Sequence, residues 1–162
     1  MVALSGAHTL GAANCKSFIY RTSGTGGDPN MDPKFKAELQ RVCGGGLLNG
    51  NDTQIISGSF EKGTFPLDPT PSYFDNAYYQ SLLNHTGLLA SDQLLVSSTE
   101  ADLVATTKVL VDKYSENKTI FQIDFGASMV KMSTIGVLTG KDGQVRQNCR
   151  MPNSQKFERR GF

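Results

Sequence analysis

Hydrophobic residues recur at helical spacing after a residue pair typical of a helix N-terminus. Asp32 and Pro33 offer a capping side chain and a residue suited to the first helical turn. Phe35, Leu39 and Val42 then follow at near-helical intervals. This pattern predicts a helix that begins at Pro33 and extends for about three turns.

Other segments also show helical patterns. Residues 1–8 form a short apolar stretch, and Asp75 is placed to start a helix that ends before Gly87. Ser97 and Glu100 have the spacing of a capping box and predict the start of another helix. The apolar residues expected on the core faces of that helix and the next are Leu103, Val104, Leu110, Val111, Tyr114, Phe121, Phe125, Met129 and Met132.

Two segments depart from the helical pattern. Residues 44–72 are rich in glycine and proline and predict a long ordered loop. Residues 137–146 predict a β-hairpin, because Asp142-Gly143 supplies the positive φ angles of a tight turn. No alternation of strands and helices occurs, so we expect a mainly α protein with one small β-hairpin and long loops.

Length and charge restrict the possible functions. The chain has 162 residues, a length typical of one domain, and a formal net charge of +1. Such a balance argues against a nucleic-acid partner. No apolar run is long enough for a transmembrane helix, and the first residues do not have the pattern of a signal peptide. We therefore expect no membrane partner.

The cysteines leave two alternatives open. The chain has three, at Cys15, Cys43 and Cys149, and their spacing is not that of a zinc site. An odd number fits a reduced cytosolic protein, or an oxidised protein in which one cysteine lacks its partner. Three Asn-x-Thr sequons favour the second alternative; they lie at Asn51, Asn84 and Asn117.

Only two histidines are present. His85 lies inside a sequon, which indicates an ordinary exposed residue. His8 ends an apolar segment, where an imidazole can emerge from a packed helix into a cavity. Ser5 lacks the glycine that a hydrolase nucleophile elbow requires two residues before the serine. His8 is therefore either a metal or haem ligand or a structural histidine.

Several motifs together are much more specific than these spacings. MVALSGAHTLG followed by a cysteine, TPSYFDNAYYQSLL, GLLASDQLL and MVKMSTIGVLTGKDGQVRQNCR occur in this order. The sequence resembles the plant secretory haem peroxidases over residues 1–150. The resemblance implies the C-terminal, proximal half of the haem peroxidase fold. Residues 151–162 depart from the family pattern, and we expect them to form a mobile tail.

The resemblance assigns roles around the haem. His8 matches the residue that binds the haem iron, and Asp92 matches the carboxylate that accepts its Nδ1 hydrogen. Asn14 matches a position near a haem propionate. From the residues alone, Asp92 fits equally well as a carboxylate at a helix N-terminus.

The resemblance also implies a calcium site. Its ligands would be the side chains of Thr9, Asp68, Thr70 and Asp75 and the carbonyl oxygen of Tyr73. Such oxygen ligands are those that calcium prefers. One residue separates Asp68 from Thr70 where the family usually has two, which makes Asp68 the weakest assignment. Without the family, Asp75 is a helix cap and Thr70 belongs to a turn.

The cysteines and the cellular location follow in the same way. The resemblance pairs Cys15 with Cys43 and leaves Cys149 without its usual partner. It implies a secreted glycoprotein of the extracellular space, cell wall or vacuole.

The implied function is that of an enzyme of the oxidative-stress response. It would use haem b and calcium to reduce hydrogen peroxide while oxidising small phenolic donors. The family's distal histidine and arginine have no match in this chain, so an N-terminal half outside it is a potential partner. The alternatives are a fragment that binds haem or calcium without catalysis and an unstable fragment without function.

Overall fold

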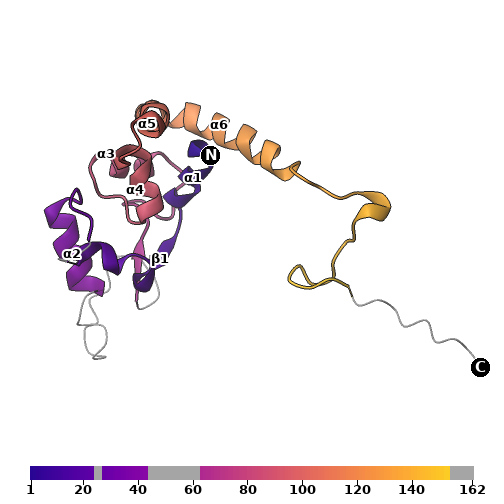
Figure 1. Ribbon diagram of the computed structural model, residues 1–162, viewed down its shortest axis with the longest axis horizontal. Coiled ribbons are helices and arrows are strands. Elements are labelled where there is room, and N and C mark those ends of the chain that lie inside the picture. The colour runs from indigo at the N-terminus through magenta and orange to yellow at the C-terminus, as the bar shows by residue number, and fades with distance from the viewer. Residues whose placement is uncertain (24–26, 44–62, 154–162) are drawn as a thin grey trace, which may run out of the picture. The chain divides into compact units, whose positions relative to one another are not determined.

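The computed structural model describes residues 1–23, 27–43 and 63–153. Within these ranges the chain is mainly helical, as predicted (Figure 1). The α-helices are α1 (Val2–Ser5), α2 (Pro33–Cys43), α3 (Ala77–Leu83), α4 (Ala90–Ser97), α5 (Ala101–Glu116) and α6 (Lys118–Ser133). Short 3₁₀ helices are η1 (Gly6–Thr9), η2 (Cys15–Ser17), η3 (Ile19–Thr22) and η5 (Gly140–Asp142).

A two-stranded antiparallel sheet joins distant parts of the chain. It pairs β1 (Ala12–Asn14) with β2 (Thr64–Pro66), and Ala13 lies opposite Phe65. The prediction of a hairpin at residues 137–146 is wrong, because η5 lies where the turn was expected and no strand flanks it. The Asp142-Gly143 pair does not form the predicted hairpin turn, since Gly143 has φ −140° and not a positive φ angle.

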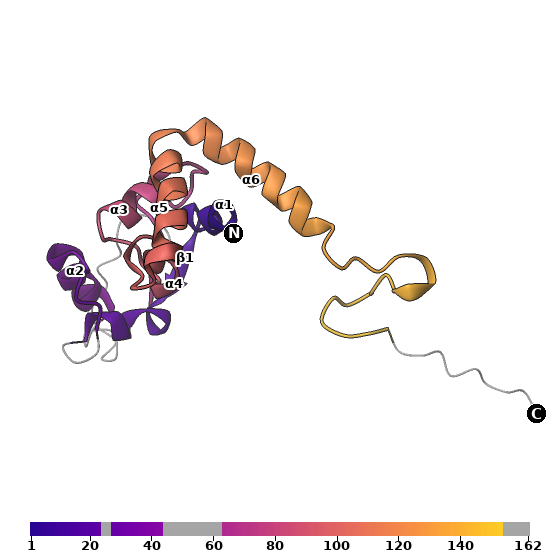
Figure 2. The ribbon, with the colours of Figure 1, turned by 45° about the horizontal axis from the view of Figure 1, so that its top comes forward.

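The chain divides into two compact units, Met1–Met129 and Val130–Phe162. In the first unit, α3, α4 and α5 pack against one another, as Figures 1 and 2 show. In the second unit, Asn153 ties its own segment together by donating to the Val145 carbonyl oxygen (2.8 Å) and accepting from the Gln147 N–H (2.9 Å). The predicted tail falls mostly on residues 154–162, which lie outside the described residues, as does most of the loop predicted at 44–72.

Two apolar clusters form the core of the first unit. The larger one joins α1 and α3 to the later helices; its buried members are Val2, Ala3, Tyr78, Tyr79, Leu82, Leu95, Val111, Tyr114 and Phe121. The second lies around the sheet and α2; its buried members are Cys15, Phe18, Met31, Leu39, Phe65 and Leu88. These clusters hold the segments before and after His8, which positions the site described below.

The predicted helix starts differ in outcome. The Asp32 carboxylate accepts the Phe35 N–H at 2.8 Å, which confirms the predicted cap of α2. Asp75 accepts the Ala77 N–H at 2.8 Å at the start of α3. The capping box of Ser97 and Glu100 is wrong, because Ser97 belongs to the end of α4 and its hydroxyl donates to the Gln93 carbonyl oxygen.

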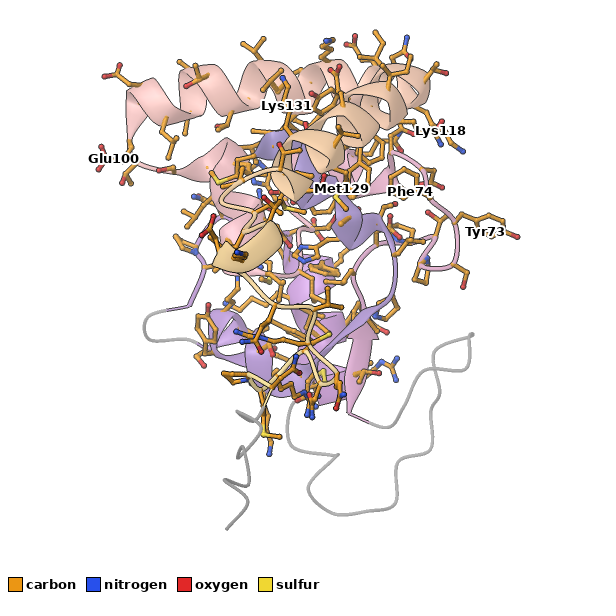
Figure 3. All side chains as sticks on the ribbon, turned by 90° about the vertical axis from the view of Figure 1, so that its right-hand side faces the viewer. Tyr73, Phe74, Glu100, Lys118, Met129 and Lys131 are labelled. Atoms are coloured by element: carbon orange, nitrogen blue, oxygen red, sulfur yellow. A yellow bond between two sulfur atoms is a disulfide. The ribbon has the colours of Figure 1, made fainter. Side chains whose placement is uncertain are left out.

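The prediction of an apolar core face on α6 is confirmed only in the first half of the helix. Phe121 is fully buried and Phe125 packs against the same cluster. Met129 and Met132, in contrast, are more than two-fifths exposed among the described residues. Figure 3 shows the side chains around Phe74, Met129 and the ends of α5 and α6.

Candidate functional site

His8 lies in η1, directly after the buried helix α1. Val2 and Ala3 anchor α1 in the larger core cluster. The Tyr79 hydroxyl donates to the Val2 carbonyl oxygen at 3.1 Å, which fixes the start of the segment. The His8 ring packs edge-on against Tyr78, with 6.2 Å between ring centroids. The imidazole is thus held by packing while its side chain stays 39% exposed.

Asp92 fixes the orientation of the His8 ring. His8 Nδ1 lies 3.1 Å from each carboxylate oxygen of Asp92, although 84 positions separate the two residues. This hydrogen bond raises the pKa of His8; burial opposes the rise, and the charge of Asp92 adds to it. Asp92 is itself buried, in the first turn of α4. Within the described part of the chain, no hydrogen bond forms at His8 Nε2.

Two buried polar side chains hold the segment that leads into α4. Gln93 accepts the Gly87 N–H at 3.1 Å and donates to the Leu82 carbonyl oxygen at 3.0 Å. Arg21 donates to the carbonyl oxygens of Gly87 and Leu88, each at 2.6 Å. These bonds hold the segment that leads into α4, the helix that carries Asp92. Sequence reasoning assigned no role to Arg21 or Gln93, because the residue type and spacing of neither one indicate a buried hydrogen-bonding side chain.

Next to His8, oxygen-bearing side chains meet in a second cluster. Thr9 is fully buried. Its hydroxyl oxygen lies 2.6 Å from Asp68 Oδ2 and 3.2 Å from Asp75 Oδ1. The Thr70 hydroxyl lies 3.0 Å from Asp75 Oδ2, and the Thr70 N–H donates to Asp68 Oδ1 at 2.8 Å. Despite the shortened spacing in the sequence, Asp68 lies together with Thr9, Thr70 and Asp75.

The carboxyl group of Asp68 has a perturbed pKa in this cluster. Burial raises the pKa of Asp68; the hydrogen bonds from Thr9 and Thr70 oppose the rise, and the charge of Asp75 adds to it. No cationic side chain of the described residues pairs with Asp68 or Asp75. A buried and a half-buried acid that lie together among hydroxyl groups, without a cationic partner in the described residues, are hard oxygen donors that fit a cation such as calcium.

Two further predicted site residues lie at the surface. The Tyr73 side chain is 70% exposed and points away from the fold (Figure 3), while its N–H donates to the Thr70 carbonyl oxygen at 2.8 Å. Asn14 is exposed, and its Oδ1 caps η2 by accepting the Lys16 N–H at 3.0 Å. The described ranges contain no group of three or more His, Cys, Asp or Glu side chains that could hold a metal.

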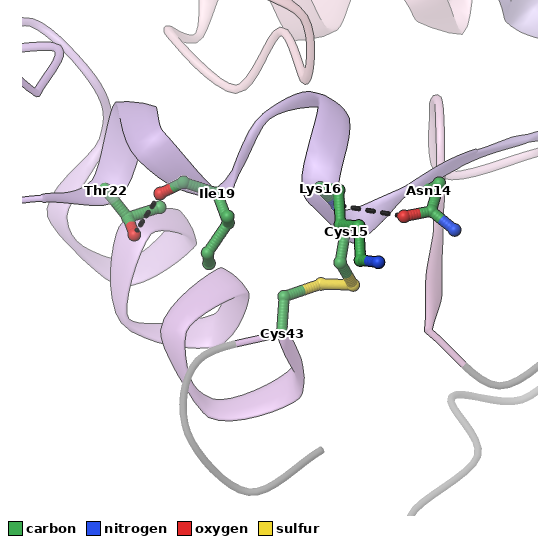
Figure 4. The surroundings of a disulfide bond; sticks show 6 residues. All are labelled: Asn14, Cys15, Lys16, Ile19, Thr22 and Cys43. Atoms are coloured by element: carbon green, nitrogen blue, oxygen red, sulfur yellow. Dashed lines mark hydrogen bonds between the residues drawn. A yellow bond between two sulfur atoms is a disulfide. The ribbon is translucent and has the colours of Figure 1, made fainter. Parts of the chain in front are cut away.

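A disulfide joins Cys15 to Cys43, the pairing that the resemblance implies (Figure 4). It connects η2 with the end of α2 across 28 positions, with 5.5 Å between the Cα atoms. Cys149 is a free, exposed thiol. Disulfides persist mainly in oxidising compartments, so this bond favours the oxidised alternative over the reduced one.

Comparison with known proteins identifies the family. A model of the family described as "Peroxidase" matches residues 1–117. The chain belongs to the peroxidase family. It is 39% identical to Peroxidase 58 of Arabidopsis thaliana and 40% identical to Peroxidase 23 of the same plant, and each comparison covers 94% of this chain. Peroxidase 2 of Hordeum vulgare is 38% identical over the same share.

The peroxidase relatives differ in how much of their length is matched. This chain spans 44% of Peroxidase 58 and 41% of Peroxidase 23, but 81% of Peroxidase 2. It therefore corresponds to less than half of the two longer relatives. None of its helices, as far as the structure describes the chain, is long and apolar enough to span a membrane.

Proposed function

We propose that this chain forms the proximal half of a haem peroxidase, in which His8 binds the iron of haem b. The observation that carries the proposal is the arrangement of the two His8 nitrogens. Nδ1 is held by the buried Asp92, and Nε2 has no hydrogen-bond partner in the described residues. Together with membership of the peroxidase family, this fits an imidazole prepared to bind metal through Nε2.

The His8–Asp92 pair suits peroxidase chemistry for an electronic reason. By accepting the Nδ1 hydrogen, Asp92 selects one tautomer and gives the ring imidazolate character. A more electron-donating ring stabilises oxidised iron relative to ferrous iron. When bound, haem supplies the redox centre at which hydrogen peroxide is reduced and small phenolic donors are oxidised. Asn14 is proposed to contribute a polar contact to a propionate.

Calcium is proposed to bind beside His8. Thr9, Asp68, Thr70 and Asp75 would supply side-chain oxygens, and Tyr73 its carbonyl oxygen. Since Thr9 directly follows His8 in η1, an ion held there would stiffen the segment that carries the imidazole. The proximity of Asp68 to Asp75 supports this site, because a bound cation would offset the repulsion between two neighbouring carboxylates.

One observation favours the alternative of a fragment that binds haem or calcium without catalysis. Cleaving peroxide requires a base that moves a proton and a cation that stabilises the leaving oxygen. The second histidine of the chain, His85, is exposed and lies in a sequon. We therefore propose that these acid and base groups belong to polypeptide outside this sequence, which would be its partner.

A haem reconstitution experiment tests the ligand. The full chain is titrated with haemin, and the Soret band is compared between wild type, His8→Ala and the control His85→Ala. We expect a histidine-type Soret band in wild type and in the control that is lost in His8→Ala. Equal spectra for wild type and His8→Ala would refute the assignment. Turnover of a phenolic donor no faster than with free haemin would favour the non-catalytic alternative.

Secretion and glycosylation are proposed as well. The Cys15–Cys43 disulfide suits an oxidising compartment, and the sequon asparagines Asn84 and Asn117 are both exposed. Asn51 lies outside the described residues. Expression behind a eukaryotic secretion signal tests this proposal: we expect a mass loss on enzymatic deglycosylation that shrinks stepwise in Asn84→Gln and Asn117→Gln. No mass loss in wild type would contradict it.

A further inference from the structure

Tyr78 has a buried hydroxyl without a partner. The residue lies in α3, is 2% exposed, and its Oη forms no hydrogen bond with any described residue. The other buried tyrosines of the same cluster are paired: Tyr79 donates to the Val2 carbonyl oxygen at 3.1 Å, and Tyr114 donates to Asp124 at 3.0 Å. A buried hydroxyl without a hydrogen-bond partner destabilises the folded state. The Tyr78 hydroxyl is therefore an exception within its own cluster.

The Asp92 carboxylate has unused positions for accepting hydrogen bonds. Its carboxylate is buried, and among the described side chains only His8 Nδ1 donates to its two oxygens. An ionised carboxylate offers about four acceptor positions. The Tyr78 ring packs edge-on against the His8 ring, with 6.2 Å between the ring centroids, and Asp92 holds Nδ1 of the same ring, so Tyr78 and Asp92 both adjoin one imidazole.

Electrostatics link the two groups directly. Burial raises the pKa of Tyr78 far above its usual value, and the Asp92 carboxylate is the next largest cause of the rise. Ser5 acts in the opposite direction and is the competing neighbour of the hydroxyl. A tyrosine hydroxyl carries one O–H donor, so it can supply a hydrogen bond that a carboxylate accepts.

We propose that the Tyr78 hydroxyl is a second donor to Asp92 and that Tyr78 is a positioning residue for the His8–Asp92 pair. Its effect on iron rests on the proposed function. A second donor disperses the negative charge of Asp92, which weakens its pull on the His8 Nδ1 hydrogen. Tyr78 thereby limits the imidazolate character of His8 and sets how strongly Nε2 donates electrons.

The contact itself is tested without haem. In the haem-free full chain, proton NMR should show a slowly exchanging downfield hydroxyl resonance that is absent in Tyr78→Phe. We expect it to move upfield in Asp92→Asn, because the acceptor loses its charge, and to remain in place in Ser5→Ala. Absence of the resonance from wild type, or a shift in Ser5→Ala in place of Asp92→Asn, would overturn the proposal.

The effect on the ligand is tested with haem bound. In Tyr78→Phe we expect the iron–histidine stretching band of the ferrous protein to move to higher frequency and the midpoint potential to become more negative. The matched control is Tyr114→Phe, which loses the hydroxyl of a buried tyrosine of the same cluster that bonds to Asp124 and not to Asp92. It should leave both readouts unchanged.

Different results would refute the positioning role of Tyr78 and the proposed binding of haem by His8. Equal stretching bands and potentials in Tyr78→Phe and wild type would refute the positioning role, as would equal shifts in both phenylalanine variants. If His8→Ala binds haem as wild type does, the proposed function fails. The hydroxyl resonance still decides whether Tyr78 donates to Asp92 in that case.

Discussion

Arg21 and Leu88 are joined across 67 positions by a 2.6 Å hydrogen bond from the guanidinium group to the carbonyl oxygen. The same buried guanidinium group donates to Asp28 and to the Gly87 carbonyl oxygen. Residues 87–88 directly precede α4, the helix that carries Asp92. The position of the carboxylate that holds His8 therefore depends on an arginine in η3.

We expect Arg21→Met to destabilise the protein by about 3–5 kcal/mol. The change leaves Asp28 without its ionic partner and two backbone carbonyls without donors, and breaking a buried pair from one side has this magnitude. Urea unfolding followed by circular dichroism measures the loss. Lys108→Met is the control: its ion pair with Asp112 is about half exposed, so the change should cost at most about 1 kcal/mol. Similar losses in both variants would contradict the role of Arg21.

The Arg21–Asp28 pair should also make stability depend on acid pH. Burial alone would raise the pKa of Asp28, but the hydrogen bonds from Arg21 and the Asn30 N–H, together with the charge of Arg21, lower it below the ordinary value of 3.8. A lowered pKa in the folded state stabilises the protein above pH 3.8, and this stabilisation is lost as the pH falls through the folded value.

Asp28→Asn removes this contribution. We expect the variant to be less stable than wild type near pH 6 and the difference to shrink steadily below about pH 4, as the wild-type carboxyl becomes protonated. Thermal melts at a series of pH values measure the difference. A gap that stays constant from pH 6 to pH 2 would show that Asp28 does not contribute through its charge.

The sequence pattern predicted an element correctly where residues within the segment itself determine where the element begins. Asp32 and Pro33 specify the start of α2 from within the segment, and that prediction is confirmed. The hairpin at 137–146 fails because turn residues alone do not make strands. The actual strands are three residues long and some fifty positions apart, and their pairing depends on tertiary packing that a local pattern does not contain.

The residues of the candidate site were predicted from the family motifs, because the spacing of residues along the sequence does not indicate them. His8 and Asp92 are 84 positions apart, and nothing in either segment alone indicates that they meet. Arg21, Gln93 and Tyr78 support the pair from buried positions. Arg21 lies outside the quoted motifs, and Gln93 and Tyr78 lie inside them without an assigned role. Their importance follows from unpaired or multiply paired polar atoms, a property of the folded chain alone.

The disulfide should provide a large share of the stability. Cys15 and Cys43 close a loop across 28 positions, and the chain-entropy model gives about 3–4 kcal/mol for such a loop. We expect Cys15→Ser with Cys43→Ser to lower the free energy of unfolding by this amount. Cys149→Ser is the control, since that thiol is free and exposed, and it should have no effect. Equal stability of the double variant and wild type would refute the prediction.

Gly6 should tolerate no side chain. A Cβ atom there would overlap the Tyr79 hydroxyl and the Phe121 ring, both fully buried. We expect Gly6→Ala to cost about 1–3 kcal/mol through overpacking. Gly126 lies inside α6 with open space around its Cβ position, so Gly126→Ala should stabilise by about 0.5–1 kcal/mol. Thermal melts compare the two variants, and shifts of the same sign would contradict the packing argument.

Calcium should raise the stability of the chain through the cluster at Thr9. At a calcium concentration one hundred times the dissociation constant, binding to the folded state alone adds about 2.7 kcal/mol. We expect the melting temperature of protein treated with a chelator to rise when calcium is added. Magnesium should have a smaller effect, because it prefers a rigid octahedron and keeps its water.

The Asp75→Asn variant distinguishes the role of Asp75 in calcium binding from its role as a helix cap. The asparagine keeps an oxygen that can accept the Ala77 N–H, as Asp75 Oδ1 does at 2.8 Å, but it lacks the negative charge that attracts calcium. The rise in melting temperature with calcium should therefore shrink in Asp75→Asn and persist in Asp112→Asn, whose carboxylate pairs with Lys108 at the surface. A calcium response that is equal in the two variants would place the ion elsewhere, and its absence from wild type would refute the site.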